Sequence, residues 1–123
     1  MRNKKQPRIR LSELNGDAGQ RTKFFALLNL GLVQSLASGI LSAPEAIELF
    51  YHAENCIYVR HHFRNKNANA IMSHGVQLPD LFESLSAEEA SREFYHELET
   101  MRLLAMKLLT TRSRDFTSSR VVA

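Results

Sequence analysis

The sequence has a single cysteine and no long apolar run. Because Cys56 is alone, no disulfide can form within the chain, which excludes a disulfide-stabilised secreted scaffold. A lone thiol suits a reducing compartment, so we expect a cytoplasmic location. No segment reaches the roughly 20 apolar residues that a bilayer-spanning helix needs. We therefore expect no membrane partner.

The short motifs of common catalytic sites are also missing. The chain has no glycine-rich phosphate loop and no Gly-x-Ser-x-Gly turn to present a nucleophile. Few loops separate the expected helices, and catalytic groups tend to lie on loops held by a scaffold. We therefore predict no catalytic residue, no cofactor and no enzyme activity.

Acidic residues are absent from residues 1–10, which carry five lysines and arginines. Residues 11–110 hold eight cations against twelve acids, a net charge of −4, so the basic character belongs to the ends of the chain. A basic tail can bind nucleic acid or an acidic surface, or it can simply be solvated. We expect a flexible basic tail over 1–16, a single helical domain over 17–110 and a frayed polar tail over 111–123.

Two tetrapeptides have the sequence of a helix start, Ser42-Ala43-Pro44-Glu45 and Ser86-Ala87-Glu88-Glu89. Each places a serine at the N-cap and a glutamate three residues later, the pattern of a capping box. Ahead of the first box, Gly39 can take the left-handed conformation that ends many helices. Asp17 is the expected cap of an earlier helix.

The apolar spacing predicts an all-α fold with two longer helices, at about residues 18–38 and 87–110. Three or four short helices are expected between them. We place these at 43–53, at 56–64, from Asn67 or Asn69 to a stop at Gly75, and from Pro79 to Leu85. The stretch 56–64 also has the composition of a strand, but no partner strand is visible and an isolated strand is not stable.

Helix 18–38 has more apolar residues than a single buried face needs. Gly31 lies in its middle, where glycine costs about 1 kcal/mol relative to alanine, and this predicts a close approach by another helix. The apolar set comprises Phe24, Phe25, Leu27, Leu28, Leu30, Leu32, Val33 and Leu36.

Two pairs of residues resemble halves of metal sites. Glu93 and His96 are three residues apart on an expected helix, as in one half of a di-iron site. His52 and Cys56 are four residues apart, but a structural zinc site takes four ligands. Neither pair has a second half in the sequence, so we predict that no metal is bound.

Residues 58–67 form the most basic stretch inside the body. They mix cations, amides and an aromatic side chain, which suits contact with phosphates and stacking on bases. With the helix at 43–53 before it, this segment has the order of a helix-turn-helix. The possible nucleic-acid contacts are Arg60, His61, Arg64 and Lys66.

The helix at 87–110 becomes apolar on nearly every side from Met101 to Leu109. Such a helix is covered on several sides, either as the central core helix or as a contact between subunits. A two-fold contact would let one patch serve both partners, so we expect a homodimer. The possible self-association residues are Met101, Leu103, Met106 and Leu109.

Two segments, 30–46 and 71–83, together resemble a family of small bacterial proteins classed as a domain of unknown function. The likeness is carried by Leu-Gly-Leu-Val-Gln-Ser-Leu at 30–36 with Gly39 and Ser42, and by Ile-Met-Ser-His-Gly at 71–75. It covers about residues 24–100. It implies a bacterial cytoplasmic setting and transfers no activity, cofactor or site residue.

These observations predict a small helical protein that acts by binding another protein, either a second copy or an unidentified regulatory or immunity-type partner. The alternative is a helix-turn-helix-like nucleic-acid-binding regulator that uses the basic stretch 60–66.

Overall fold

Seven helical elements follow one another along the chain, and residues 7–122 contain no strand. The computed structural model describes the backbone of residues 7–122 and the side chains of residues 7–110. The predicted all-α class is confirmed. The elements are a 3₁₀ turn η1 (Leu11–Glu13), α1 (Ala18–Ala37), α2 (Ala43–Leu49), α3 (Ala53–Tyr58), a π-helical turn η2 (Val59–Phe63), α4 (Lys66–Ser84) and α5 (Ala87–Val122).

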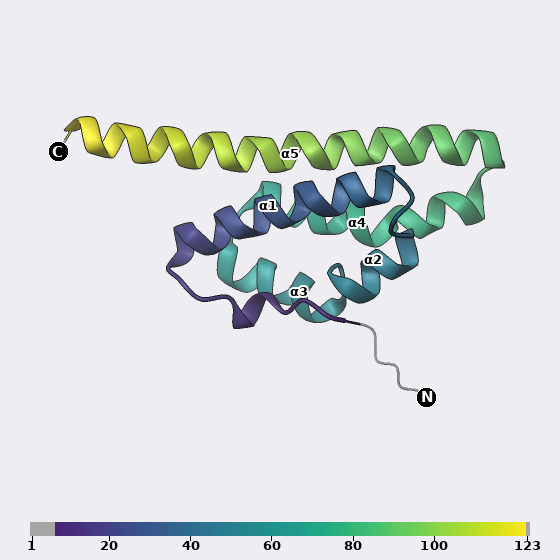
Figure 1. The fold of residues 1–123 in the computed structure, drawn as a ribbon, viewed down its shortest axis with the longest axis horizontal. Coiled ribbons are helices and arrows are strands. Elements are labelled where there is room, and N and C mark those ends of the chain that lie inside the picture. The colour runs from purple at the N-terminus through teal and green to yellow at the C-terminus, as the bar shows by residue number, and fades with distance from the viewer. Residues whose placement is uncertain (1–6, 123) are drawn as a thin grey trace.

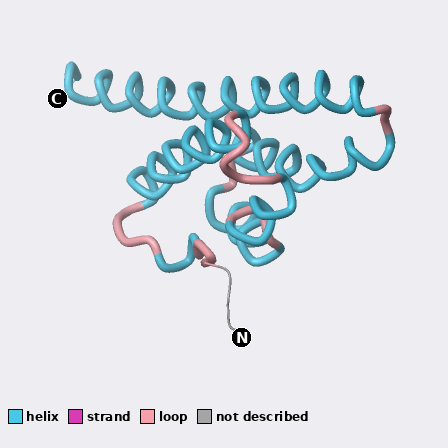
Figure 2. The backbone as a smooth tube through the Cα atoms, turned by 45° about the vertical axis from the view of Figure 1, so that its right-hand side comes forward, coloured by secondary structure: helices cyan, strands magenta, loops and turns pink. Residues whose placement is uncertain are grey.

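The helices are arranged in three layers (Figure 1). The long helix α5 lies across α1 and α4, which give it its two largest interfaces. Below α1 and α4 lie α2, α3 and the N-terminal segment of residues 7–14, which we call the arm (Figures 1 and 2). The middle layer is therefore covered from both sides, and the core lies on either side of it.

Side-chain caps begin α1, α2 and α5, as the sequence predicted. The Asp17 side chain accepts a hydrogen bond from the Gln20 N–H, and the Gln20 side-chain oxygen accepts one from the Asp17 N–H. Ser42 and Glu45 make the same reciprocal pair. At Ser86 the hydroxyl accepts from the Glu89 backbone but donates to the Glu89 carboxylate. Both serines are therefore at helix starts.

Helix α4 is continuous where the sequence predicted two short helices. Gly75 does not end it, and Pro79 lies inside it. A Cβ built on Gly75 would lie 2.5–2.7 Å from ring atoms of Tyr51, so glycine is required here to let that ring approach. Packing against Tyr51 is the reason for this glycine, and no helix end is involved.

The turn at residues 50–52 ends α2 earlier than the predicted end at Ala53. Tyr51 is buried, and its hydroxyl donates to the Asn29 side chain across 2.6 Å. His52 caps α3 by accepting the Asn55 N–H. The ambiguous stretch 56–64 is helical, and it ends with Arg64 in the left-handed conformation (φ 49°).

Aromatic rings from α1, the turn at residues 50–52 and η2 pack together in the core. Phe25 of α1 lies 5.9 Å from Phe50 and 5.3 Å from Phe63, between ring centroids. Phe50 in turn meets Tyr51 edge-on at 5.1 Å. Edge-to-face rings at these separations add about 1 kcal/mol per pair to the burial of apolar area.

The predicted start of the helical domain needs correction, and the last helix is longer than predicted. Leu11 is fully buried and belongs to the core cluster, so the packed body begins within the arm and not at residue 17. Residues 1–6 lie outside the described part. At the other end α5 continues to Val122, beyond the predicted end near Thr110.

Candidate functional site

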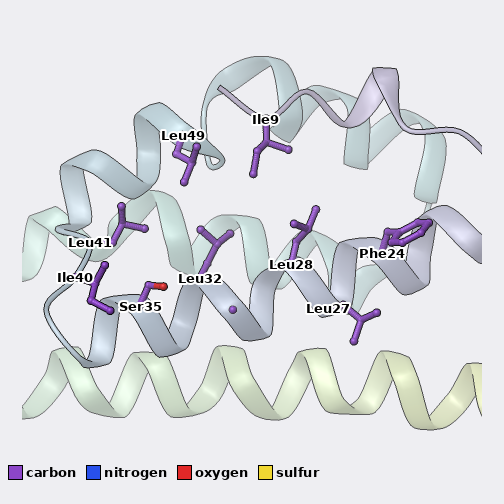
Figure 3. Close-up of a pocket in the computed structure, with 10 residues that line it drawn as sticks. Ile9, Phe24, Leu27, Leu28, Leu32, Ser35, Ile40, Leu41 and Leu49 are labelled. Carbon is purple, nitrogen blue, oxygen red and sulfur yellow. The ribbon is translucent and has the colours of Figure 1, made fainter. Parts of the chain in front are cut away.

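An open apolar groove runs along one flank of α1. It has a volume of about 450 Å³, and α1 faces the arm, α2 and the α1–α2 turn across it (Figure 3). Ser35 is the only polar side chain in its lining. The lining residues are Ile9, Phe24, Leu27, Leu28, Gly31, Leu32, Ser35, Ile40, Leu41 and Leu49.

Helix α1 forms the floor because its surplus apolar residues fall on a second face. Positions 24, 28, 31 and 35 are spaced four, three and four residues apart, so they share one flank of the helix. Phe24 is 51% exposed and Leu27 46% exposed. The apolar residues of α1 that exceed one buried face therefore form the floor of the groove.

Gly31 lies in this floor and meets no other element. Nothing lies within 4 Å of a Cβ built on it, so the predicted close helix–helix approach at Gly31 is wrong. The missing side chain instead deepens the groove between Leu28 and Leu32, whose side chains point toward Ile9 and Leu49 (Figure 3).

The arm supplies the opposite wall through Ile9. The Ile9 N–H donates to the Leu49 carbonyl at 2.9 Å, which ties the arm to the end of α2. The Ile9 carbonyl accepts from the Asn55 side chain at 2.9 Å and contacts His52 Nε2 at 3.0 Å. This wall could not be predicted from the sequence, because the basic and mixed composition of residues 1–16 does not indicate a segment held against the body.

Asn55 holds the arm in place. Its side chain accepts the Leu11 N–H at 3.0 Å and donates to the carbonyls of Ile9 and Phe50. Asn55 is fully buried, and the Leu11 N–H and the Phe50 carbonyl depend on it for a side-chain partner. His52 completes the arrangement: Nδ1 accepts from the Asn55 N–H, so Nε2 is the nitrogen that donates to Ile9.

The far end of the groove is set by the turn after α1. Gly39 has a φ of 81°, which favours glycine. The chain reverses there, and Ile40 is left 78% exposed at the edge of the groove. Such exposure of a large aliphatic side chain beside an apolar hollow is typical of a binding surface.

Two further hollows border the core. One, of about 610 Å³, lies among the ends of α1 and α4 and the starts of α2 and α5, with Phe82 and Tyr95 in its lining. The other, of about 480 Å³, lies between α3 and α4, and Cys56, Arg60, Asn69, Ser73 and Gln77 contribute to it. Burial raises the pKa of the Cys56 thiol and the Arg60 charge opposes this, so Cys56 is no activated nucleophile.

The predicted nucleic-acid contacts lie together on the surface. Arg60 and His61 are on η2, Arg64 follows it, and Lys66 begins α4; all four are exposed. The helix-turn-helix arrangement is absent from the described chain, because α2 packs mainly on α4 and shares no substantial interface with α3.

The four self-association candidates divide into two kinds. Met101 is fully buried and belongs to the core, so its placement at a subunit contact is wrong. Leu109 is partly buried against the core cluster. Leu103 and Met106 are 54% and 41% exposed. Of the four candidates, only these two are exposed.

The predicted half-sites for metal stay separate. Glu93 and His96 are both exposed, while His74 of α4 pairs with Glu97 of α5 instead. Both ring nitrogens of His52 make hydrogen bonds, one with the Ile9 carbonyl of the arm and one with the Asn55 N–H. Among residues with described placement, no group of three or more histidine, cysteine, aspartate or glutamate side chains is arranged to hold a metal ion.

Comparison of the chain with protein-family models, with curated proteins and with solved structures finds no match. The resemblance to a bacterial family therefore stays a prediction. Within the described residues, no helix combines the length and apolarity that crossing a membrane requires.

Proposed function

We propose that this chain is a non-catalytic binding protein whose groove receives an amphipathic helix with an acidic polar face from a partner protein. The observation that carries the proposal is the groove itself: apolar, open to solvent and lined by no titratable side chain. A helix laid into such a groove would bury its apolar face at positions i, i+3, i+4 and i+7.

The length of the groove fits a short helix. Its α1 floor runs from Phe24 to Ser35, eleven residues further along the helix. At about 1.5 Å per residue this is about 17 Å, or three turns of a partner helix. The rim at Ile40 and Leu41 extends the apolar surface beyond that floor.

The charges around the groove support an acidic partner. Helix α1 carries Arg21 and Lys23 and no acid along its entire length. On the opposite wall the arm exposes Arg8, while α2 exposes Glu45 and Glu48. A partner helix with acidic residues beside its apolar face would meet complementary charge at Arg21 and Lys23 of α1 and at Arg8 of the arm.

Occupants from this chain itself fit less well. Residues 1–6 are Met-Arg-Asn-Lys-Lys-Gln, which offer one apolar side chain for a groove of this length. A second copy would present Leu103 and Met106 from α5, which are too few to line three turns. Self-association through those two residues is the competing proposal, and their exposure is what favours it.

The test uses a designed peptide with leucines at helical spacing and glutamates elsewhere, labelled for fluorescence anisotropy. Replacement of Gly31 by leucine places a side chain in open space within the groove, so the fold is retained and binding is expected to be lost. Gln34→Leu is the matched control, because Gln34 is exposed on α1 but outside the groove lining.

Equal binding by both variants, or none by the unaltered protein, would contradict the proposal. Sedimentation at micromolar concentration tests the competing proposal separately. A mass of twice 14.0 kDa that Leu103→Glu with Met106→Glu reduces to the single-chain value would favour the homodimer. We propose a cytoplasmic location for this function, supported by the single free thiol of Cys56.

A further inference from the structure

The charges of the described body are segregated. Residues 55–79 contain Arg60, Arg64 and Lys66 and no acid, whereas Asp80 to Glu99 contain seven acids. The cation-bearing part is the end of the α3–η2 helix, the turn after it and the start of α4. We call this surface the η2 end; it comprises Arg60, His61, His62, Arg64 and Lys66.

The cations of the η2 end are free to contact a ligand. All three are exposed, and none takes part in an ion pair among residues with described side chains. Elsewhere the exposed arginines Arg10 and Arg102 are paired with glutamates. Unpaired cations collected where the chain has no acid make a local positive field that attracts polyanions.

An aromatic platform accompanies these cations. The rings of Tyr58 and His62 are stacked, with centroids 4.3 Å apart and planes 14° from parallel. Tyr58 is partly buried and fixes the stack, while His62 is exposed. The outer face of an exposed ring held in this way is a surface on which a nucleobase can stack.

From these observations we infer that the η2 end binds single-stranded nucleic acid, its cations on the phosphates and its His62 ring against a base. This site is separate from the groove and goes beyond the function proposed above. Arg60 also borders the hollow lined by Asn69, Ser73 and Gln77, whose amides and hydroxyl offer hydrogen bonds to a nucleotide.

The shape of the η2 end selects single strands over duplex. A helix that reads duplex DNA lies straight in the major groove. Here the α3 helix has six residues, widens into a five-residue π turn and stops at the left-handed Arg64. Cations on a helix end and a turn can follow a flexible backbone, but they do not form a recognition helix.

The experiment is fluorescence anisotropy with a labelled oligouridylate and with a duplex of matched length, over a range of salt. The combined variant Arg60→Gln, Arg64→Gln and Lys66→Gln should weaken single-strand binding at least tenfold. The slope of log K against log salt should fall by about 2, as expected when three phosphate contacts to a single strand are lost. The matched control is Lys23→Gln, Arg92→Gln and Lys107→Gln, three exposed cations on α1 and α5.

A second pair of variants separates stacking from charge. His62→Ala should weaken binding about fivefold or more, within the range for loss of one stacked base, and His62→Phe should restore it. Equal weakening by the control triple, tighter binding to the duplex, or no binding of the oligouridylate would overturn the inference. So would loss of binding in Arg2→Gln, Lys4→Gln and Lys5→Gln with none in the η2-end triple.

Discussion

The two sides of α1 differ in their packing: one side is filled where Gly75 of α4 meets Tyr51, and the other is left open at Gly31 of α1 itself. On the closed side, Gly75 of α4 admits the Tyr51 ring, which bonds back to Asn29 of α1, and no space is left. On the open side, Gly31 of α1 faces empty space at the floor of the groove. Sequence alone treats both as helix-weakening residues, yet one completes the packing and the other preserves a hollow.

The comparison supports the proposal that the groove is a binding surface. An alanine at Gly31 would be the better helix former by about 1 kcal/mol, and the site has room for it. The arm opposite is held in place by buried polar groups, as Asn55 demonstrates. A wall fixed in this way and a floor left empty suggest a surface kept for a ligand.

The largest effect should come from Asn55→Ala, which removes the side chain that holds the arm against the body and so frees one wall of the groove. The buried Leu11 N–H and the Phe50 carbonyl would each lose a partner, so the free energy of unfolding should fall by about 3 kcal/mol. Chemical denaturation measures it. Asn69→Ala is the control, since the Asn69 side chain makes no hydrogen bond among residues with described side chains; a similar loss in the control would contradict the role given to Asn55.

Gly75→Ala tests the closed side. The new Cβ would overlap the Tyr51 ring, so either the ring or α4 must move, and we expect a loss of about 2 kcal/mol in unfolding free energy. The same denaturation experiment applies. Gly75→Ala combined with Tyr51→Leu should lose less than the two single variants added together, and simple additivity would show that the contact is unimportant.

Ser42→Ala acts at the turn that closes the groove. Removal of the hydroxyl that accepts the Glu45 N–H should lower stability by about 1 kcal/mol. Ser42→Asp should retain most of that stability, because aspartate also caps helices. A loss as large with aspartate as with alanine would indicate a role for Ser42 other than capping.

Gly31→Ala should have the opposite sign from Gly75→Ala. With nothing within 4 Å, the added methyl group should stabilise the protein by about 0.5–1 kcal/mol through helix propensity. The same methyl group should make the groove shallower and weaken binding of the acidic test peptide. Destabilisation would show that Gly31 contacts another element after all.

The smallest effect concerns Glu99, which lies away from both flanks of the comparison. Two hydrogen bonds from Arg102 and its nearby charge lower the pKa of this carboxyl. Since the folded pKa is the lower one, the contribution to stability is present above the ordinary pKa of glutamate and is lost as the pH falls through the folded value. NMR titration should show the Glu99 pKa rising in Arg102→Gln, with no change in groove binding; an unchanged pKa would contradict the pairing.

The sequence predicted the parts of this fold that depend on local chemistry. The caps at Asp17, Ser42 and Ser86 could be predicted because each hydrogen bond joins residues only three positions apart in the sequence. Gly75 does not end a helix as predicted, because its place depends on the ring of Tyr51, more than twenty residues away. The surplus apolar residues of α1 were visible, but whether α5 or solvent would meet Phe24 and Leu27 is decided by the tertiary arrangement.

The candidate sites were predicted unequally for the same reason. Arg60, His61, Arg64 and Lys66 are neighbours in sequence, so their common exposure followed from their composition. The groove joins Ile9 to residues of α1 and to Leu49, and it depends on hydrogen bonds between positions more than forty residues apart. The spacing of apolar residues along the chain does not indicate such a contact.

The hydrogen bond from the Leu11 N–H to the Asn55 side chain also allows detachment of the arm to be measured by hydrogen exchange. Leu11 is fully buried, and its N–H has a side chain as its acceptor, outside any helix of regular length. Exchange of that hydrogen with solvent deuterium requires the arm to leave the body, whereas exchange along α1 requires the helix itself to open. The ratio of the two exchange rates therefore measures how often the wall of the groove detaches while the rest of the protein stays folded.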